Sequence, residues 1–234
     1  MREVLYNGYD ISVHNSEIDW NALKCDFVIL RAGYGKTVNQ KDKLFEQHYE
    51  NAKKRGKFVG AYWYSYAMTE AEAIQEAKAC IEVIKNKKFE FPIYFDLEED
   101  KQFKTGKTNV SKIIRAFLNE VEKAGYFVGL YTNYNALCHY IDDDIKTRYN
   151  IWLAHWDISY PIYGGQFSVW QSGVGKNIAG AGGAIDVDKC YDDLPKIIKE
   201  KGLNGYSSDT EPDTITVAIK VNNKTYTGEL TAHN

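Results

Sequence analysis

The heptapeptide GKFVGAY at residues 56–62 returns almost unchanged as GYFVGLY at residues 125–131. In both places the apolar spacing of an amphipathic helix comes first, a glycine suited to a helix C-cap follows, and an apolar run ends in tyrosine. Helix, glycine cap and buried strand are the parts of a repeated βα unit. The repeat therefore predicts an α/β fold that is built from such units.

The chain contains eight short apolar runs with the character of strands. They cover residues 4–11, 27–32, 58–66, 92–98, 127–132, 151–155, 168–171 and 184–188. Most of the runs are nearly continuous rather than alternating, which indicates strands that are covered on both faces. Eight such strands with helices between them predict a closed, TIM-like (β/α) barrel.

Helical periodicity fills most of the gaps between the earlier runs. It predicts helices over residues 44–56, 69–84, 110–125 and 194–201, with shorter ones near 20–23 and 134–140. The connections between the last three runs are instead rich in glycine and tyrosine. We therefore expect an irregular barrel with eight strands, about five helices and short hairpin-like links near its end.

The composition changes after the last predicted helix. We expect residues 1–201 to form the barrel, and the Gly, Ser, Asp and Pro content of residues 202–213 indicates a linker. Residues 214–221 alternate like a strand, and a turn then leads into a second strand. Residues 214–234 are therefore predicted to form a β-hairpin tail or the start of a further module.

The composition also limits the classes of partner. The 234 residues carry a formal net charge of −3, which does not favour nucleic acid or an anionic membrane surface. No run approaches the ~18 apolar residues of a membrane span, and residues 1–8 lack the apolar core of a signal peptide. We expect a protein that is made in the cytoplasm and released, or one secreted after loss of a leader. The four cysteines have no metal-site or disulfide-framework spacing, and we expect buried thiols.

One apolar run, FPIYFDLEED at residues 91–100, leads directly into acidic residues. Side chains alternate along a strand, so Asp96 and Glu98 are expected on the same side. Neighbouring carboxylates repel, so one of them tends to keep its proton near neutral pH, and acid–base chemistry at a glycosidic bond needs this asymmetry. For the motif alone, a polar turn that closes the strand is the alternative. Glu99 is expected to point away, and Asp100 to belong to the next loop.

Two further acids fall on the first and last strands, which are neighbours in a closed barrel: Asp10 and Asp186. With Asp96 and Glu98 they would place four carboxylates at one mouth, an arrangement that is costly for acids without a function. Taken alone, Asp10 could equally be a residue of a turn or a helix cap rather than an acid of a site. Asp188 points to the same side as Asp186 but lies further along the strand, and we interpret it as structural.

Polar and aromatic residues at other strand ends are candidates for binding a sugar. They are Arg31, Tyr62, Tyr64, Tyr131, Asn133, Trp152 and Gln171. Tyrosine and tryptophan rings can stack on sugar rings, and the two amides can form hydrogen bonds. Core packing is the alternative for each aromatic residue. His14 and His155 lack the spacing of a metal-binding motif, so neither a metal nor another cofactor is expected.

Eight motifs, in chain order, carry a resemblance to a known family. They are GYDIS (8–12), FVILRAGYG (27–35), VGAYWYS (59–65), PIYFDLE (92–98), GLYTN (129–133), IWLA (151–154), VWQ (169–171) and IDVD (185–188). Together they resemble glycoside hydrolase family 25, the Chalaropsis-type lysozymes or N-acetylmuramidases, which include many phage endolysins. The likeness runs through residues 5–198 and leaves out the tail. It implies an irregular β/α barrel with fewer helices than strands.

By this resemblance Glu98 matches the general acid and Asp96 its partner carboxylate, while Asp10 and Asp186 match the supporting acids of the cleft. The implied reaction is hydrolysis of the β-1,4 bond between N-acetylmuramic acid and N-acetylglucosamine in peptidoglycan. Glu98 would protonate the leaving oxygen and then deprotonate water, while Asp96 stays ionised. Whether Asp96 attacks covalently or supports the acetamido group is open, and the resemblance favours the second.

Two other functions remain as alternatives. A catalytically inactive peptidoglycan-binding module could use the same barrel, since a fold does not guarantee activity. A chitinase-like glycosidase is the other, although the chain lacks the D-x-x-D-x-D-x-E spacing of those enzymes. Peptidoglycan strands are the expected partner of a lysozyme and of a binding module alike. A homodimer formed through the C-terminal tail is a further expectation.

Overall fold

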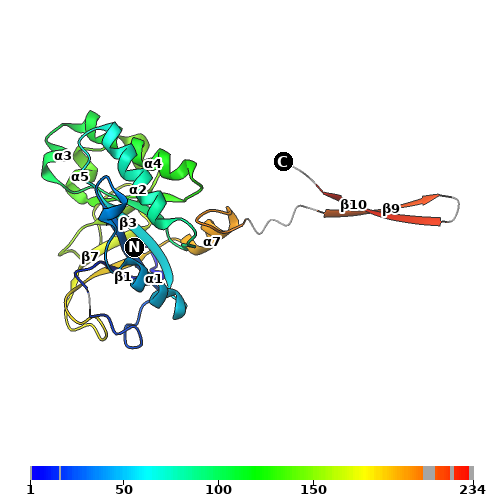
Figure 1. Ribbon diagram of the computed structural model, residues 1–234, viewed down its shortest axis with the longest axis horizontal. Helices are drawn as coiled ribbons and strands as arrows, with labels where there is room; N and C mark the ends of the chain where they lie inside the picture. Colours follow the sequence, from blue (N-terminus) through cyan, green and yellow to red (C-terminus); the bar gives the residue numbers. More distant parts are fainter. Residues whose placement is uncertain (1, 16, 208–213, 222–223, 232–234) are drawn as a thin grey trace.

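The computed structural model describes residues 2–15, 17–207, 214–221 and 224–231. Eight strands close into a barrel in the order β1 to β8, with α2, α3, α4 and α5 gathered on one side of it (Figure 1). The strands are Tyr6–Ile11 (β1), Phe27–Tyr34 (β2), Phe58–Tyr64 (β3), Ile93–Asp96 (β4), Val128–Asn133 (β5), Asn150–Ala154 (β6), Val169–Gly175 (β7) and Ile185–Cys190 (β8). The predicted eight-stranded α/β barrel is confirmed.

The last strand runs against both of its neighbours. Neighbouring strands from β1 to β7 are parallel, whereas β8 is antiparallel to β7 and to β1. The cause is the short link between Gly175 and Ile185, because a parallel connection needs a crossover of about a dozen or more residues. Strand β8 therefore starts at the end of the barrel where the other strands finish.

Seven α-helices and one short 3-10 helix accompany the described strands. They are Val38–Gln40 (η1), Phe45–Lys54 (α1), Glu70–Ile84 (α2), Asp100–Phe103 (α3), Lys107–Lys123 (α4), Tyr134–His139 (α5), Asp143–Arg148 (α6) and Leu194–Glu200 (α7). Thr69 caps α2, since its hydroxyl accepts a hydrogen bond from the Glu72 N–H at 3.2 Å. The helix expected near residues 20–23 is wrong. A single turn forms there, closed by the Leu23 N–H on the Asp19 carbonyl oxygen, before the chain enters β2.

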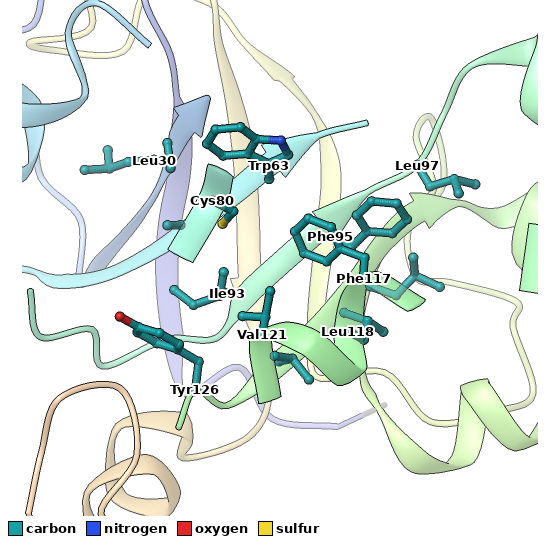
Figure 2. Close-up of a cluster of buried hydrophobic side chains, with 14 of the residues drawn as sticks. Leu30, Trp63, Cys80, Ile93, Phe95, Leu97, Phe117, Leu118, Val121 and Tyr126 are labelled. Atoms are coloured by element: carbon teal, nitrogen blue, oxygen red, sulfur yellow. The ribbon is translucent and has the colours of Figure 1, made fainter. Parts of the chain in front are cut away.

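Helices α2 and α4 cover the outer side of the barrel over its central strands. Phe95 of β4 stacks on Phe117 of α4 with ring centroids 4.3 Å apart. Figure 2 shows Leu118 and Val121 of the same helix beside this pair. Outward-facing side chains of β4 are thus fixed by helix packing, which holds the strand end that carries Asp96.

Aromatic side chains fill the inside of the barrel. The largest inward-pointing ones are Phe27, Tyr62, Tyr94, Tyr131 and Trp152, and all of them are buried. Tyr131 and Tyr94 both lie against Trp152, with ring centroids 4.4 and 5.1 Å from the indole. This packed layer is the floor beneath the mouth, at which the C-terminal ends of the parallel strands meet.

Residues 202–207, expected to begin the linker, lie against the barrel. Asn204 is fully buried, and its amide nitrogen donates to the carbonyl oxygens of Phe89 and Phe91 at 3.1 and 2.9 Å. Its Oδ1 accepts from the Phe127 N–H at 2.7 Å. The packed barrel unit therefore continues beyond the last predicted helix.

The tail forms a separate two-stranded antiparallel sheet of Thr214–Val221 (β9) and Lys224–Thr231 (β10). Its alternating sequence predicted these strands. The remainder of the expected linker, residues 208–213, lies outside the described residues, as do residues 222–223 and 232–234.

Two compositional expectations can be placed in the structure. None of the helices in the described part of the chain is long and apolar enough to cross a membrane. All four cysteines are free thiols, and Cys80 and Cys190 are buried, whereas Cys25 and Cys138 are partly exposed.

Candidate active site

Two groups of residues meet at the barrel mouth. Strand register pairs Tyr64 with Asp96 and Asp96 with Tyr131, so these three lie side by side. Asp10 pairs with Asp186 across the seam between β1 and β8. Because β8 runs away from the mouth, its early residue Asp186 reaches the level of the late β1 residue Asp10.

A cavity of about 520 Å³ lies at this mouth. Its walls contain ten of the eleven predicted site residues: Asp10, Arg31, Tyr62, Tyr64, Asp96, Glu98, Tyr131, Trp152, Gln171 and Asp186. The structure does not bring Asn133 to this cavity. Its side chain instead accepts a hydrogen bond from the Ala136 N–H at 2.9 Å and caps α5. Asn133 directly precedes that helix, whose free N–H groups attract such a side chain.

Glu98 lies just beyond the end of β4, not within the strand as expected. Its side chain is exposed at the rim of the cavity, whereas the intervening Leu97 is buried. Desolvation by the cavity wall nevertheless raises the pKa of Glu98, and the charges of Glu99 and Asp186 add to this, while the Tyr64 hydroxyl acts in the opposite direction. A raised pKa at an accessible rim is what a proton donor needs.

Asp96 lies deeper than Glu98 and is only 4% exposed. Burial raises its pKa well above the usual range; the charges of Glu98 and Asp10 add to this, and Arg31 opposes it. Its Oδ1 is buried without a hydrogen-bond partner among the described residues. The cavity alone therefore favours a proton on Asp96, whereas the sequence interpretation kept this residue ionised.

Gln171 connects Asp10 to the aromatic wall. Its amide nitrogen donates to Asp10 Oδ2 at 2.8 Å. Its Oε1 accepts from the Tyr131 hydroxyl at 2.9 Å and from Trp156 Nε1 at 3.0 Å. Burial raises the pKa of Asp10 to about 7, helped by the charge of Asp186, while the bond from Gln171 works against this rise. A single amide thus fixes Asp10 and two rings relative to one another.

The protein-family model described as "Glycosyl hydrolases family 25" matches residues 9–180. The chain belongs to this family. It is therefore a glycoside hydrolase, and the resemblance carried by the eight motifs is confirmed. No match was found among curated proteins.

Solved structures agree with this assignment. The CTP1L endolysin superposes with a TM-score of 0.73 and 29% identity, over 83% of this chain and 70% of its own. The modular autolysin LytC from Streptococcus pneumoniae gives 0.68 and 30%, over 80% of this chain but 46% of its own. This chain thus corresponds to less than half of LytC. A bacterial lysozyme from Streptomyces coelicolor, 20% identical over 87% and 97% of the two chains, shares the fold with a TM-score of 0.69.

The acid cluster of this family 25 hydrolase contains a fifth member, Asp188. It is fully buried and accepts a hydrogen bond from Trp152 Nε1 at 2.8 Å. Burial raises its pKa well above the usual range, and the charge of Asp10 adds to the effect. The sequence pattern predicts a structural role for Asp188, because this residue lies further along the strand than Asp186. Reversal of β8 indeed places it deeper than Asp186, but in contact with the same cluster.

Arg31 is held in place by Asp42, an acid that the sequence interpretation missed. Arg31 Nε donates to Asp42 Oδ2 at 2.7 Å. The buried Asp42 also accepts from the N–H groups of Val13 at 3.0 Å and Leu44 at 2.9 Å. Asp42 follows a loop rather than a strand, so periodicity gave no signal for it. Its bonds direct the Arg31 guanidinium toward the cavity from a fixed position.

The predicted sugar-stacking role of Trp152 does not suit its position. Trp152 is 1% exposed and forms part of the floor, with Tyr62 packed edge-on against it at 6.0 Å. The exposed ring in the wall is Trp156, which is 46% exposed. Trp156 stands two residues beyond the end of β6, and its closeness to a strand end was the signal that could have identified it.

The described residues contain no group of three or more His, Cys, Asp or Glu side chains that could hold a metal ion. Among the acids of the cavity wall, Glu98 is the most accessible and is therefore the best placed to exchange a proton with a substrate. The carboxyl cluster, one cation and an aromatic wall are a combination suited to acid–base chemistry on a neutral or weakly charged sugar.

Proposed function

We propose that this glycoside hydrolase is a lysozyme that cleaves the β-1,4 bond between N-acetylmuramic acid and N-acetylglucosamine in bacterial peptidoglycan. The observation that carries the proposal is the pairing of an exposed Glu98 with a buried Asp96 in a cavity whose wall bears an exposed Trp156. Similar solved structures include an endolysin and LytC, which was solved with a synthetic peptidoglycan ligand. The protein would act on the cell wall after release from the cell that makes it.

Glu98 is proposed as the general acid and base. Its rim position allows it to protonate the leaving glycosidic oxygen and then to deprotonate the water that enters. Its raised pKa keeps a larger fraction of it protonated at the start of the reaction. Glu98 can therefore donate one proton to the leaving oxygen and accept another from water within a single turnover.

Asp96 is proposed to offset the positive charge that develops near the anomeric carbon, or on an acetamido-assisted intermediate. Burial and the charge of Glu98 raise the pKa of Asp96, so its negative charge needs a favourable neighbour. A positive centre or an N–H donor of the substrate would be such a neighbour and would stabilise ionised Asp96.

Asp10 and Asp186 are proposed to position Asp96, the acetamido group or a water. Asp10 is the better fixed of the two, because Gln171 donates to it at 2.8 Å. The aromatic wall and Arg31 would contact the sugar. The predicted homodimer through residues 214–234 stays a prediction, which sedimentation of the full chain tests.

The proposal predicts that Glu98→Gln lowers turnover by about 100- to 10,000-fold, the usual value of a general acid. Release of new reducing ends from purified cell walls measures it, and mass spectrometry of the released muropeptides identifies which sugar carries the new end. Asp100→Asn is the matched control, because Asp100 is an exposed acid two residues away that does not line the cavity.

Wild-type lysis by the Glu98→Gln variant would contradict the assignment. If the unaltered protein co-sediments with cell walls but releases no reducing ends, the inactive binding module is the correct alternative. New reducing ends from chitin but not from peptidoglycan would favour the chitinase-like alternative.

A further inference from the structure

A second cavity, of about 610 Å³, adjoins the site and shares His14, Arg31 and Tyr64 with it as wall residues. We call it the annex. Its other wall residues are Val13, Tyr34, Asn39, Lys41, Asp42, Lys43 and Tyr66. It lies over the segments that follow β2 and β3. A ligand that is bound at the acid cluster can therefore extend directly into it.

The annex and the site have opposite charge. The walls of the site hold four carboxyl groups and one basic residue other than histidine, Arg31. The annex adds Lys41 and Lys43 to Arg31, against the single acid Asp42. Asp42 is already committed to Arg31 and to two backbone N–H groups. The annex thus carries a net positive charge beside a cluster of acids.

One of these cations is free to bind a ligand. Lys41 pairs with Glu46 at 3.2 Å. Lys43 is exposed and forms no ion pair among the described residues. An exposed ammonium group without a partner can gain a carboxylate at little cost in desolvation.

The annex also offers flat aromatic surface. Tyr34 and Tyr66 are 36% and 42% exposed, and their rings stand nearly perpendicular, at 89°, with centroids 6.2 Å apart. Tyr66 continues toward the site through Tyr64, whose ring centroid is 5.1 Å away. Such rings present apolar faces with hydroxyl edges, which suit sugar and peptide groups.

Buried polar groups hold the annex wall in one conformation. Glu76 of α2 is fully buried and accepts from the Tyr66 N–H at 2.9 Å. Gln102, also fully buried, donates to the Ala67 carbonyl oxygen at 2.9 Å and to Ser65 Oγ at 3.2 Å. These bonds partner polar groups that would be costly to bury alone, and they tie residues 65–67 to α2 and α3. A fixed wall is the condition for a preorganised binding site.

We propose that the annex binds a carboxylate attached to the muramic acid residue of the same substrate, through the lactyl ether or the peptide that it carries. The inference rests on the proposed function. The acid cluster repels any carboxylate on the substrate, and the adjoining cations attract it, so the two cavities together orient the strand. The annex thereby selects a charged glycan over a neutral one.

The test compares native glycan strands with strands whose carboxyls have been amidated by carbodiimide and ammonia, which removes charge and retains size. We expect the wild type to have a KM about two- to fivefold lower for native strands, the range of an exposed ion pair. Lys43→Gln should raise the KM for native strands to the amidated value and leave kcat unchanged. Lys78→Gln is the matched control, since Lys78 is exposed on α2 and lines neither cavity.

Strands stripped of peptide by an amidase distinguish the two sources of the carboxylate. A Lys43-dependent preference that persists on stripped strands identifies the lactyl carboxylate, and one that disappears identifies the peptide; either result supports the inference. An unchanged ratio of native to amidated KM in Lys43→Gln overturns it while the proposed function stands. A wild type that releases no reducing ends from any strand overturns both.

Discussion

At the scale of single residues, Gln171 determines how the site is ordered. Its amide oxygen receives Tyr131 and Trp156, so its nitrogen must face Asp10. Asp10 is thereby given a donor that a carboxylate neighbour could not supply. A glutamate at this position has no N–H group. Near neutral pH it would place a negative charge beside Asp10 where the native protein has a hydrogen-bond donor.

We therefore expect Gln171→Glu to lower kcat at pH 7 by about 10- to 100-fold, through misplacement of Asp10 and the aromatic wall. The loss should be smaller at pH 5, because a protonated glutamate can again donate to Asp10. Initial rates of reducing-end release at the two pH values measure this. Gln166→Glu, an exposed site that does not line the cavity, should change neither rate. An equal loss at both pH values would contradict the hydrogen-bond explanation.

At the scale of elements, the antiparallel direction of β8 decides where the acids Asp186 and Asp188 lie. It carries Asp186 to the mouth and Asp188 into the barrel, beside Asp10. The pKa of each of these three carboxyls is raised in the folded protein, with burial as the first cause. The folded state thus binds protons more tightly than the unfolded chain. The contribution of these groups to stability is present at low pH and is lost as pH rises through their folded-state pKa values.

Asp188→Asn should therefore stabilise the protein increasingly as pH rises. Asparagine can still accept from Trp152 and cannot ionise. We expect a gain of about 1–3 kcal/mol in the free energy of unfolding at pH 8 and almost none at pH 4. Denaturant unfolding at pH 4, 6 and 8 measures it. Asp144→Asn is a control of opposite sign, because the Arg115 bond lowers the pKa of Asp144. A gain that is independent of pH would contradict the argument.

Much of this element-level arrangement follows from sequence, because buried strands and amphipathic helices leave strong periodic signals. The position of Asp96 at a strand end is one example. The direction of β8 does not follow, because an I-D-V-D alternation is the same in either direction and only the short link decides it. The sequence predicts Asn133 as a sugar-binding residue because it ends a strand. The same residue also caps the helix that follows, and this turns its side chain away from the cavity. Asp42 and Trp156 act from irregular segments, where side-chain direction depends on tertiary contacts.

At the scale of the whole molecule, Asn204 joins the C-terminal end of the barrel unit to two strands. Its side chain satisfies the carbonyl oxygens of Phe89 and Phe91 ahead of β4 and the N–H of Phe127 ahead of β5. Its own φ of 57° lies in the left-handed region that asparagine tolerates. Asn204 lies in the expected linker, yet its hydrogen bonds join the chain segments that lead into β4 and β5.

Asn204→Ala should destabilise the protein by about 3 kcal/mol, since it leaves buried backbone groups without partners. Part of this cost comes from an alanine at positive φ. Asn177→Ala isolates that part, because Asn177 has a φ of 60° and is exposed. Chemical denaturation of both variants measures the difference. Equal losses in the two variants would mean that the Asn204 hydrogen bonds contribute nothing.

The seam between β1 and β8 joins residues that are far apart in the chain, since Tyr6 pairs with Cys190 and Asp10 with Asp186. Contacts of such long sequence separation form late and slowly in folding. The acid cluster straddles this seam. Completion of the barrel and maturation of the enzyme are therefore one event, and a nascent chain still lacking β8 has no assembled site. Catalytic competence in this fold therefore depends on closure of the barrel at the seam between β1 and β8.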